Sequence, residues 1–285
     1  DEAIALARRA DRLYVALADA RLGVFALDDP TAPALVGTVA LPAAGEHLLV
    51  HGDLLLVAAG EAGLLVLDLA DPDAPALASA VETPGSARHV AADGSLIAVA
   101  DDAGLALVDL ADPARPRVVS LVGTVGAARG VALDGGRALV ASVPVGIEVF
   151  DLAIPEAPAP LDPVPVPGGA TRVVRHGAVV FALGRDLSAL VDGDDGGLRV
   201  VGRASGSATG RGLAITAGVA LVACGDAGLD VIDIEPPDSP PALATASVPG
   251  AAFGVAAAGD LTLVGADDLE VFDTADPADP RHLGT

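Results

Sequence analysis

Basic and histidine side chains recur in this sequence at intervals of about 41 residues. The recurring positions are His47, the adjacent pair Arg88 and His89, and then Arg129, Arg172 and Arg211. The chain has only 16 basic residues, so this recurrence uses a large share of them. A guanidinium group is a planar fork of donors that suits a carboxylate or a phosphate. These residues are predicted to hold a small anionic ligand, unless acidic residues of the same or the next repeat neutralise each arginine.

Acidic residues form two further candidate sites. One acid recurs at a matching place in five repeats: Asp19, Glu61, Asp102, Asp226 and Asp267. Such a ring could gather Ca²⁺ or Mg²⁺, although acids are also typical of solvated hairpin tips. A second candidate metal site is Asp192, Asp194 and Asp195, where alternating acids before a glycine match part of a Ca²⁺-binding loop. The distal Glu of such a loop is absent, so a hairpin without metal is the alternative, and no other cofactor is expected.

Catalytic residue sets are scarce. His47 and His89 could meet on neighbouring strands and, with Glu46, make a metal or acid–base set. Ser207 lies in Gly-Ser-Ala-Thr-Gly, but no strand-to-helix turn of a nucleophile elbow follows it. The single cysteine, Cys224, stands among apolar residues and is expected to be a buried, inert thiol. The sequence therefore predicts no catalytic residue.

A repeat of about 41 residues positions these side chains. In each copy an apolar run ends in Asp, followed by Asp-Pro and by a second Pro three residues later, as in residues 63–75. Each copy contains four short apolar segments, and Asp-Gly pairs such as Asp93-Gly94 mark hairpin turns between them. Four antiparallel strands per repeat, with no helical pattern, predict an all-β, seven-bladed β-propeller. The seven blades of this single domain are expected near residues 1–43, 44–84, 85–125, 126–168, 169–208, 209–249 and 250–285.

The propeller geometry places the candidate residues. The basic and histidine positions fall at the starts of the innermost strands, where they would surround the mouth of the central channel. The repeated Asp-Pro steps fall at the corner into the outermost strand, where Asp accepts from nearby backbone amides and Pro extends the preceding residue. These aspartates are therefore predicted to stabilise turns rather than to bind a ligand. The ring is expected to close with whole blades side by side.

Composition narrows the choice of partners. The formal net charge is −23, with 39 acidic residues, so nucleic acid and anionic membranes would be repelled at long range. No apolar run reaches the length of a membrane span without charge, Gly or Pro, so membrane insertion is not expected. Aromatic residues are only 2% of the chain, so the core must be packed from Ala, Val and Leu. A protein or a small anion remains as the predicted partner.

The repeat resembles a known family. The pattern Gly-Leu-x-Val-x-Asp-x-x-Asp-Pro-x-x-Pro is similar to the LVIVD-type repeat of bacterial and archaeal propellers, and residues 104–109 and 228–233 carry it most clearly. Two places depart from it, because Ala26 replaces the strand-end Asp of the first copy and the fifth copy keeps Asp192 but loses both prolines. The resemblance implies an exported or cell-surface protein. It implies no shared activity, so it assigns no functional residue.

Three functional interpretations follow. The first is a non-enzymatic scaffold or binding module, exported from or exposed on a prokaryotic cell, with a small anion or a protein at its channel mouth. The second is a hydrolase or lyase at the same mouth, with His47, Arg88, His89 and Arg129 as ligands or electrostatic stabilisers. The third is a designed or reconstructed propeller without a natural ligand, because Lys, Asn, Gln, Met and Trp are all absent.

Overall fold

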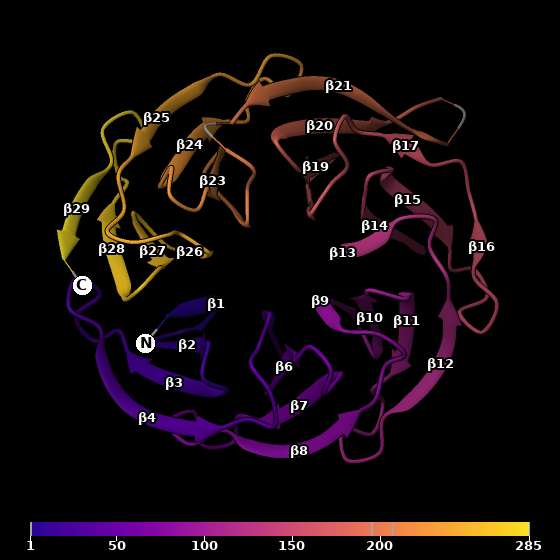
Figure 1. The fold of residues 1–285 in the computed structure, drawn as a ribbon, viewed down its shortest axis with the longest axis horizontal. Helices are drawn as coiled ribbons and strands as arrows, with labels where there is room; N and C mark the ends of the chain where they lie inside the picture. Colours follow the sequence, from indigo (N-terminus) through magenta and orange to yellow (C-terminus); the bar gives the residue numbers. More distant parts are fainter. Residues whose placement is uncertain (1, 195, 207, 285) are drawn as a thin grey trace.

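Seven antiparallel sheets surround a central axis in the computed structural model, which describes residues 2–194, 196–206 and 208–284 (Figure 1). Each sheet is built from consecutive strands, so each is one blade of a ring. The predicted seven-bladed, all-β propeller is confirmed. Among the described residues, no helix is long and apolar enough to cross a bilayer.

The strands occupy the same order in every blade, from the channel outwards. The innermost strands are β1 (Ala3–Arg9), β5 (His47–His51), β9 (Ala87–Asp93), β13 (Ala127–Asp134), β18 (Arg172–His176), β22 (Gly212–Thr216) and β26 (Gly254–Ala258). The second strands are β2 (Arg12–Leu17), β6 (Leu54–Ala58), β10 (Leu96–Asp101), β14 (Arg137–Val143), β19 (Val179–Leu183), β23 (Val219–Ala223) and β27 (Leu261–Gly265). The third strands are β3 (Arg21–Ala26), β7 (Leu64–Asp68), β11 (Gly104–Asp109), β15 (Gly146–Asp151), β20 (Asp186–Asp192), β24 (Leu229–Asp233) and β28 (Leu269–Asp273). The outermost strands are β4 (Ala34–Ala40), β8 (Ala76–Val81), β12 (Arg117–Val122), β16 (Ala159–Pro160) with β17 (Val164–Pro165), β21 (Leu198–Ser205), β25 (Ala242–Ala246) and β29 (Arg281–Gly284).

The outer strand of the fourth blade departs from the regular pattern. It is divided into β16 and β17, which pair separately with β15. Residues 155–167 contain a proline at almost every second or third position, and a proline has no amide to donate to a ladder. The strand is therefore interrupted where its amides are missing.

The core is shared between neighbouring blades. Seven apolar clusters form, each from residues of two adjacent blades, for example Leu56 and Leu64 of the second blade with Val90 and Val108 of the third. Burial of both faces of the middle strands explains why their sequences are nearly continuous apolar runs. Cys224 is buried as predicted, and burial raises the pKa of its thiol to about 12, so it is not a nucleophile at neutral pH.

The aspartates of the repeat stabilise turns. After the third strand, Asp68 accepts the amide of Ala70 at 2.8 Å and Asp109 accepts that of Ala111 at 3.0 Å. At the following corner, Asp71 accepts the amide of Asp73 at 3.0 Å. Each contact spans two residues, as in an Asx turn. The interpretation of these residues as turn formers is confirmed.

A glycine opens four of the third strands, β7, β11, β15 and β24, and it has a steric reason. Gly63, Gly104, Gly146 and Gly228 all have positive φ, between 73° and 145°. A Cβ at Gly228 would stand 2.2 Å from the carbonyl oxygen of Ala246 on β25, and the other three would meet the same kind of oxygen. Only glycine fits this close approach of the third strand to the outer strand.

We expect Gly228→Ala to destabilise the protein by about 2–4 kcal/mol, because it adds both a backbone clash and an unfavourable φ. Urea unfolding measures this change. Gly123→Ala is the matched control, since Gly123 has no atom within 4 Å of an added Cβ and no positive φ. Equal stability of the two variants would contradict the steric explanation.

The ring closes without exchange of a strand between the ends of the chain. The first blade is β1–β4 and the last is β26–β29, and the two described ends lie side by side in Figure 1. The seam is held by the amide of Ala3, which donates to the carbonyl of Ala266 at 2.8 Å, and by a shared apolar cluster that includes Leu13 and Leu263. Whole blades therefore pack against each other at the seam, as expected from the sequence.

Candidate functional site

The seven innermost strands present two equivalent positions to the channel. The inner position is the residue of the innermost strand that lies four residues before the last residue paired with the second strand. The rim position is the residue directly before the inner position. The rim residues are Ile4, Glu46, Arg88, Arg129, Thr171, Arg211 and Phe253. The inner residues are Ala5, His47, His89, Gly130, Arg172, Gly212 and Gly254. Arg172 thus stands one position further in than Arg129, in register with the two histidines.

Space between neighbouring strands decides what the inner position can hold. A Cβ at Gly130 would meet the carbonyl oxygen of Thr171 in the next blade at 2.9 Å, and one at Gly212 would meet that of Phe253 at 2.7 Å. The inner side chain therefore points towards the next blade, and close strands require glycine there. The second and third blades leave room for the rings of His47 and His89.

Bulges in the inner strands direct three rim side chains. The pairing register shifts at Ile4, Arg88 and Arg129, each of which has no partner on the second strand. A bulged residue is turned away from the regular pleat, and bulges are common next to functional sites. Two of the candidate arginines are thus presented by local irregularity rather than by the regular repeat.

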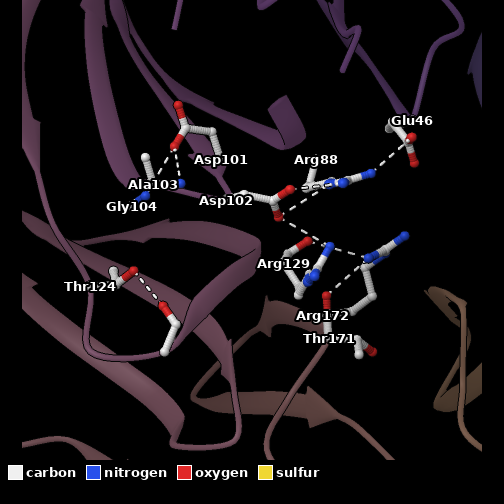
Figure 2. A network of polar contacts seen from close by, with 11 residues as sticks. Glu46, Arg88, Asp101, Asp102, Ala103, Gly104, Thr124, Arg129, Thr171 and Arg172 are labelled. Carbon is white, nitrogen blue, oxygen red and sulfur yellow. Dashed lines mark hydrogen bonds and ion pairs between the residues drawn. The ribbon is translucent and has the colours of Figure 1, made fainter. Parts of the chain in front are cut away.

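Two rim arginines are neutralised by acids. Arg88 lies 3.1 Å from Glu46 and 2.8 Å from Asp102, and Arg129 lies 3.1 Å from Asp102 (Figure 2). The hydrogen bond from Arg88 lowers the pKa of Asp102 below its ordinary value and keeps its carboxylate ionised. For these two arginines the structure has the alternative arrangement, in which acids of the same or a neighbouring blade compensate the charge.

Arg172 and Arg211 differ from the other two. Arg172 Nη1 donates to the backbone oxygens of Thr171 at 3.0 Å and Arg129 at 3.3 Å, and Arg211 stacks over the ring of Phe253 at 4.8 Å. Among the described residues, neither has a carboxylate within ion-pair distance. Burial lowers the pKa of Arg172 to about 10; the charge of Glu46 opposes this shift and that of Arg129 adds to it, so the group stays charged at neutral pH. Two guanidinium groups therefore remain without an ion-pair contact among the described residues.

His47 and His89 form a stacked pair. Their ring centroids are 3.6 Å apart and their planes differ by 20°. His47 Nδ1 accepts the amide of Val90 at 3.4 Å, and His89 Nδ1 accepts that of Val131 at 3.5 Å. Burial lowers the pKa of His47 to about 3 and that of His89 well below its ordinary value, with the charge of Arg172 contributing to both. Both rings are therefore neutral at physiological pH.

These residues line two adjoining cavities along the axis. The mouth cavity, of about 370 Å³, is lined by Glu46, Arg129, Arg172, Arg211 and Phe253. The channel cavity has a similar volume, about 370 Å³, and is lined by His47, His89 and Arg172 with many apolar side chains. Arg172 and Phe253 belong to both linings. The structure thus brings together all six residues predicted to bind a ligand, five of them on the cavity walls and Arg88 paired with Glu46.

Comparison with known proteins bears on the repeat and on the fold. The family model of the LVIVD repeat matches residues 45–83, 84–124 and 208–245. These ranges correspond to the second, third and sixth blades. The resemblance drawn from the sequence is confirmed there. A solved structure, that of the computationally designed Ika8 protein, is similar with a TM-score of 0.70 at 13% identity, covering 100% of this chain and 88% of that one. This likeness concerns the fold alone, and no curated protein matches the chain.

The LVIVD blades supply only part of the site. They contribute Glu46, His47, Arg88, His89 and Arg211, whereas Arg129 and Arg172 come from blades that the family model does not match. Arginine occurs at the rim position in matched and unmatched blades alike, and the matched blades differ among themselves at the inner position. The LVIVD repeat therefore accounts for the blade and not for the chemistry at the channel.

The candidate metal residues lie at the end of β20, in a blade that the family model does not match. Asp192 is paired with Arg137 at 2.7 Å and with Arg175 at 3.3 Å, and Arg137 lowers the pKa of its carboxyl. Ca²⁺ would have to compete with both guanidinium groups for this carboxylate. Asp194 is described but Asp195 lies outside the described residues. In the part of the chain that the structure describes, no three His, Cys, Asp or Glu residues gather as a metal site would require. The acids that recur at the hairpin tips therefore form no such group with one another.

One site residue, Phe253 of the seventh blade, was not predicted from the sequence. It occupies the rim position, lines both cavities and carries the stacked Arg211. A search restricted to charged and histidine side chains could not find it. Counting back from the hairpin turn of the seventh copy to the rim position would have found it.

Proposed function

We propose that this protein is a non-enzymatic binding module that holds a small carboxylate at its channel mouth. The propeller fold and the LVIVD repeats support a scaffold or binding role, and the charge distribution of the site supports the ligand. The observation that carries the proposal is that Arg172 and Arg211 face one cavity and make no ion pair with a described residue, since the acid that shares this lining, Glu46, is paired with Arg88.

The excess of positive charge is local. Glu46 and Asp102 balance Arg88 and Arg129, which leaves the charges of Arg172 and Arg211 on a protein whose net charge is −23. A charge that lies inside a cavity is screened less by salt than one at the surface. An anion that enters the mouth would balance charges that the protein leaves unbalanced. A guanidinium fork also matches the two oxygens of a carboxylate.

The histidine pair supports binding rather than acid–base catalysis. A general base at neutral pH needs a pKa near the working pH and a free lone pair that faces the substrate. The Nδ1 lone pairs of His47 and His89 face backbone amides, and a pKa of about 3 makes His47 a weak base. An exported or cell-surface location is part of the proposal and rests on the resemblance to LVIVD proteins alone.

Calorimetric titration with pentanoate tests the proposal. We expect the wild-type protein to bind, and Arg172→Gln and Arg211→Gln each to weaken binding tenfold or more, because a hydrogen bond to a charged group contributes about 1.5–3 kcal/mol. Arg281→Gln is the matched control, since Arg281 is 72% exposed and pairs with Asp279 away from the channel. Absence of binding to the wild type, or an equal affinity in all three variants, would overturn the proposed function.

A further inference from the structure

The channel cavity contains a second set of hydrogen-bond donors, one position further in than the rim arginines and level with Arg172. We propose that His47 and His89 together bind an uncharged oxygen of the ligand, so that the ligand class is a carboxylate with a short apolar chain and a keto group. This inference rests on the proposed function, since Arg172 and Arg211 would hold the carboxylate end. The inference adds the chemical group at the opposite end of the ligand, which is a keto oxygen.

The backbone contacts assign the proton on each ring. In each histidine Nδ1 accepts an amide hydrogen from the next blade, from Val90 to His47 and from Val131 to His89. A neutral imidazole that accepts at Nδ1 carries its hydrogen on Nε2. Among the described residues, no hydrogen-bond partner reaches either Nε2. His89 is only 7% exposed, and its ring borders the channel cavity, so its unpartnered donor can be reached only from that cavity.

A buried donor without a partner is costly, at about 1–3 kcal/mol. The two donors belong to rings stacked 3.6 Å apart, so one carbonyl oxygen with two lone pairs is suited to accept from both. A ligand that supplies this oxygen would satisfy two polar groups that the protein leaves open. This requirement distinguishes a keto acid from a simple fatty acid of the same length.

Charge favours an uncharged acceptor over a second carboxylate. Both histidines are neutral at physiological pH. The charged residues of the cavity lining are Glu46, Arg172 and Arg175, and Arg175 is paired with Asp134 and Asp192. Glu46 would repel a second anion, and Arg172 is already assigned to the first. A carbonyl gains two hydrogen bonds without the cost of burying a second negative charge.

The rest of the lining fits a short hydrocarbon chain. Apolar side chains such as Leu49, Val131, Leu133, Val173 and Val255 line the channel cavity from the level of the histidines inwards. Cavities of about 300–1,000 Å³ with apolar walls and a few convergent polar groups are typical of small-molecule sites. A chain of a few carbons would join the carboxylate end to the keto end within these walls.

A metal ion does not explain the pair. A metal needs the lone pair of a ring nitrogen, but each Nε2 carries hydrogen as long as Nδ1 accepts an amide. The described residues supply no third ligand beside them.

Titration with three five-carbon acids tests the inference: pentanoate, 4-oxopentanoate and glutarate. We expect 4-oxopentanoate to bind about tenfold more tightly than pentanoate, because two neutral hydrogen bonds contribute about 0.5–1.5 kcal/mol each. Glutarate should bind no more tightly than pentanoate. In the double variant His47→Phe with His89→Phe, the ratio of the 4-oxopentanoate and pentanoate affinities should fall to about one. The control His176→Phe, at an exposed histidine at the end of β18, should keep the wild-type ratio.

The outcomes separate the two proposals. Equal affinities for 4-oxopentanoate and pentanoate, or tightest binding of glutarate, would overturn the keto-acid inference and leave carboxylate binding intact. Failure of all three acids to bind would overturn the proposed function as well. The NMR signals of the two Nε2–H groups give a readout that needs no variant. They should shift with 4-oxopentanoate and not with pentanoate, and a lack of any difference would contradict the inference even if the double variant does not fold.

Discussion

Lowering the pH from 6.5 to 4.5 is expected to destabilise the wild-type protein more than the double variant His47→Phe with His89→Phe, by up to about 5 kcal/mol. Each histidine that is neutral in the folded state but protonated in the unfolded state contributes about 1.4 kcal/mol per pH unit. The stacked pair holds both rings neutral, since burial lowers the pKa of His47 to about 3 and also lowers that of His89.

The sign of this effect follows from proton binding. Above the ordinary histidine pKa, near 6.5, neither state binds a proton and the pair contributes no pH dependence. As the pH falls below that value the unfolded chain binds protons that the folded protein refuses, so the free energy of unfolding decreases. The decrease continues until the folded rings protonate, near pH 3 for His47. Asp102, whose pKa is lowered by Arg88, adds to the loss only below about pH 4, outside the measured window.

Urea unfolding at half-unit pH steps gives the free energy of unfolding as a function of pH. The effect is the difference in the slope of this curve between the wild type and the double variant. The exposed His176 gives the control, since His176→Phe should follow the wild-type slope. Parallel curves for the wild type and the double variant would show that the pair is protonated in the folded state or hydrated enough to titrate normally.

The second large effect is expected at Asp101, in the turn between β10 and β11. Its carboxylate is 1% exposed and accepts three backbone amides, those of Gly85 at 3.1 Å, Ala103 at 2.8 Å and Gly104 at 2.9 Å. Gly85 lies in the link between the second and third blades, so one side chain connects this link to the hairpin turn. Figure 2 shows the contacts of Asp101 with Ala103 and Gly104. Asp101→Ala should lower the free energy of unfolding by about 3–5 kcal/mol, because buried amides lose a charged acceptor.

Two further variants show whether the amide contacts cause the loss. Asp112→Ala removes an exposed aspartate that accepts the single amide of Ala114, and should cost about 1 kcal/mol or less. Asp101→Asn keeps one carbonyl oxygen for part of the set and should fall between the two. Thermal or urea unfolding measures all three changes. A similar loss for Asp101→Ala and Asp112→Ala would contradict a special role for the buried carboxylate.

The blade could be predicted from the sequence because its signals are local. Glycine at the start of the third strand, Asp at its end and Pro at the corner each act within a few residues or on the adjacent strand. The repeat then multiplies these local signals. The division of the fourth blade's outer strand was not predicted, because the repeat pattern led us to expect the same four strands in every copy. The prolines that interrupt this strand are visible in the sequence.

The site was predictable only in outline. The spacing brought the correct side chains to the channel, but charge compensation depends on contacts between blades. Arg88 reaches Glu46 of the preceding blade, and bulges of one residue decide which side chain faces the rim. Arg172 stands one position further in than Arg129. The repeat spacing locates equivalent positions only to within about one residue, so it could not show this difference. Asp101 was overlooked beside Asp102, because two adjacent acids in a turn look alike until their burial is known.

The way the ring closes also affects how such a protein can change by mutation. Because every blade is one continuous segment and no sheet is shared between the two ends, the order of blades around the axis does not depend on where the chain is opened. A circularly permuted chain, joined across the seam and opened in another link, would keep all seven sheets whole. Duplication or loss of one copy would likewise add or remove a complete sheet. Divergence of single blades, such as the one that carries Arg172, can then proceed without disturbing the pairing of any other.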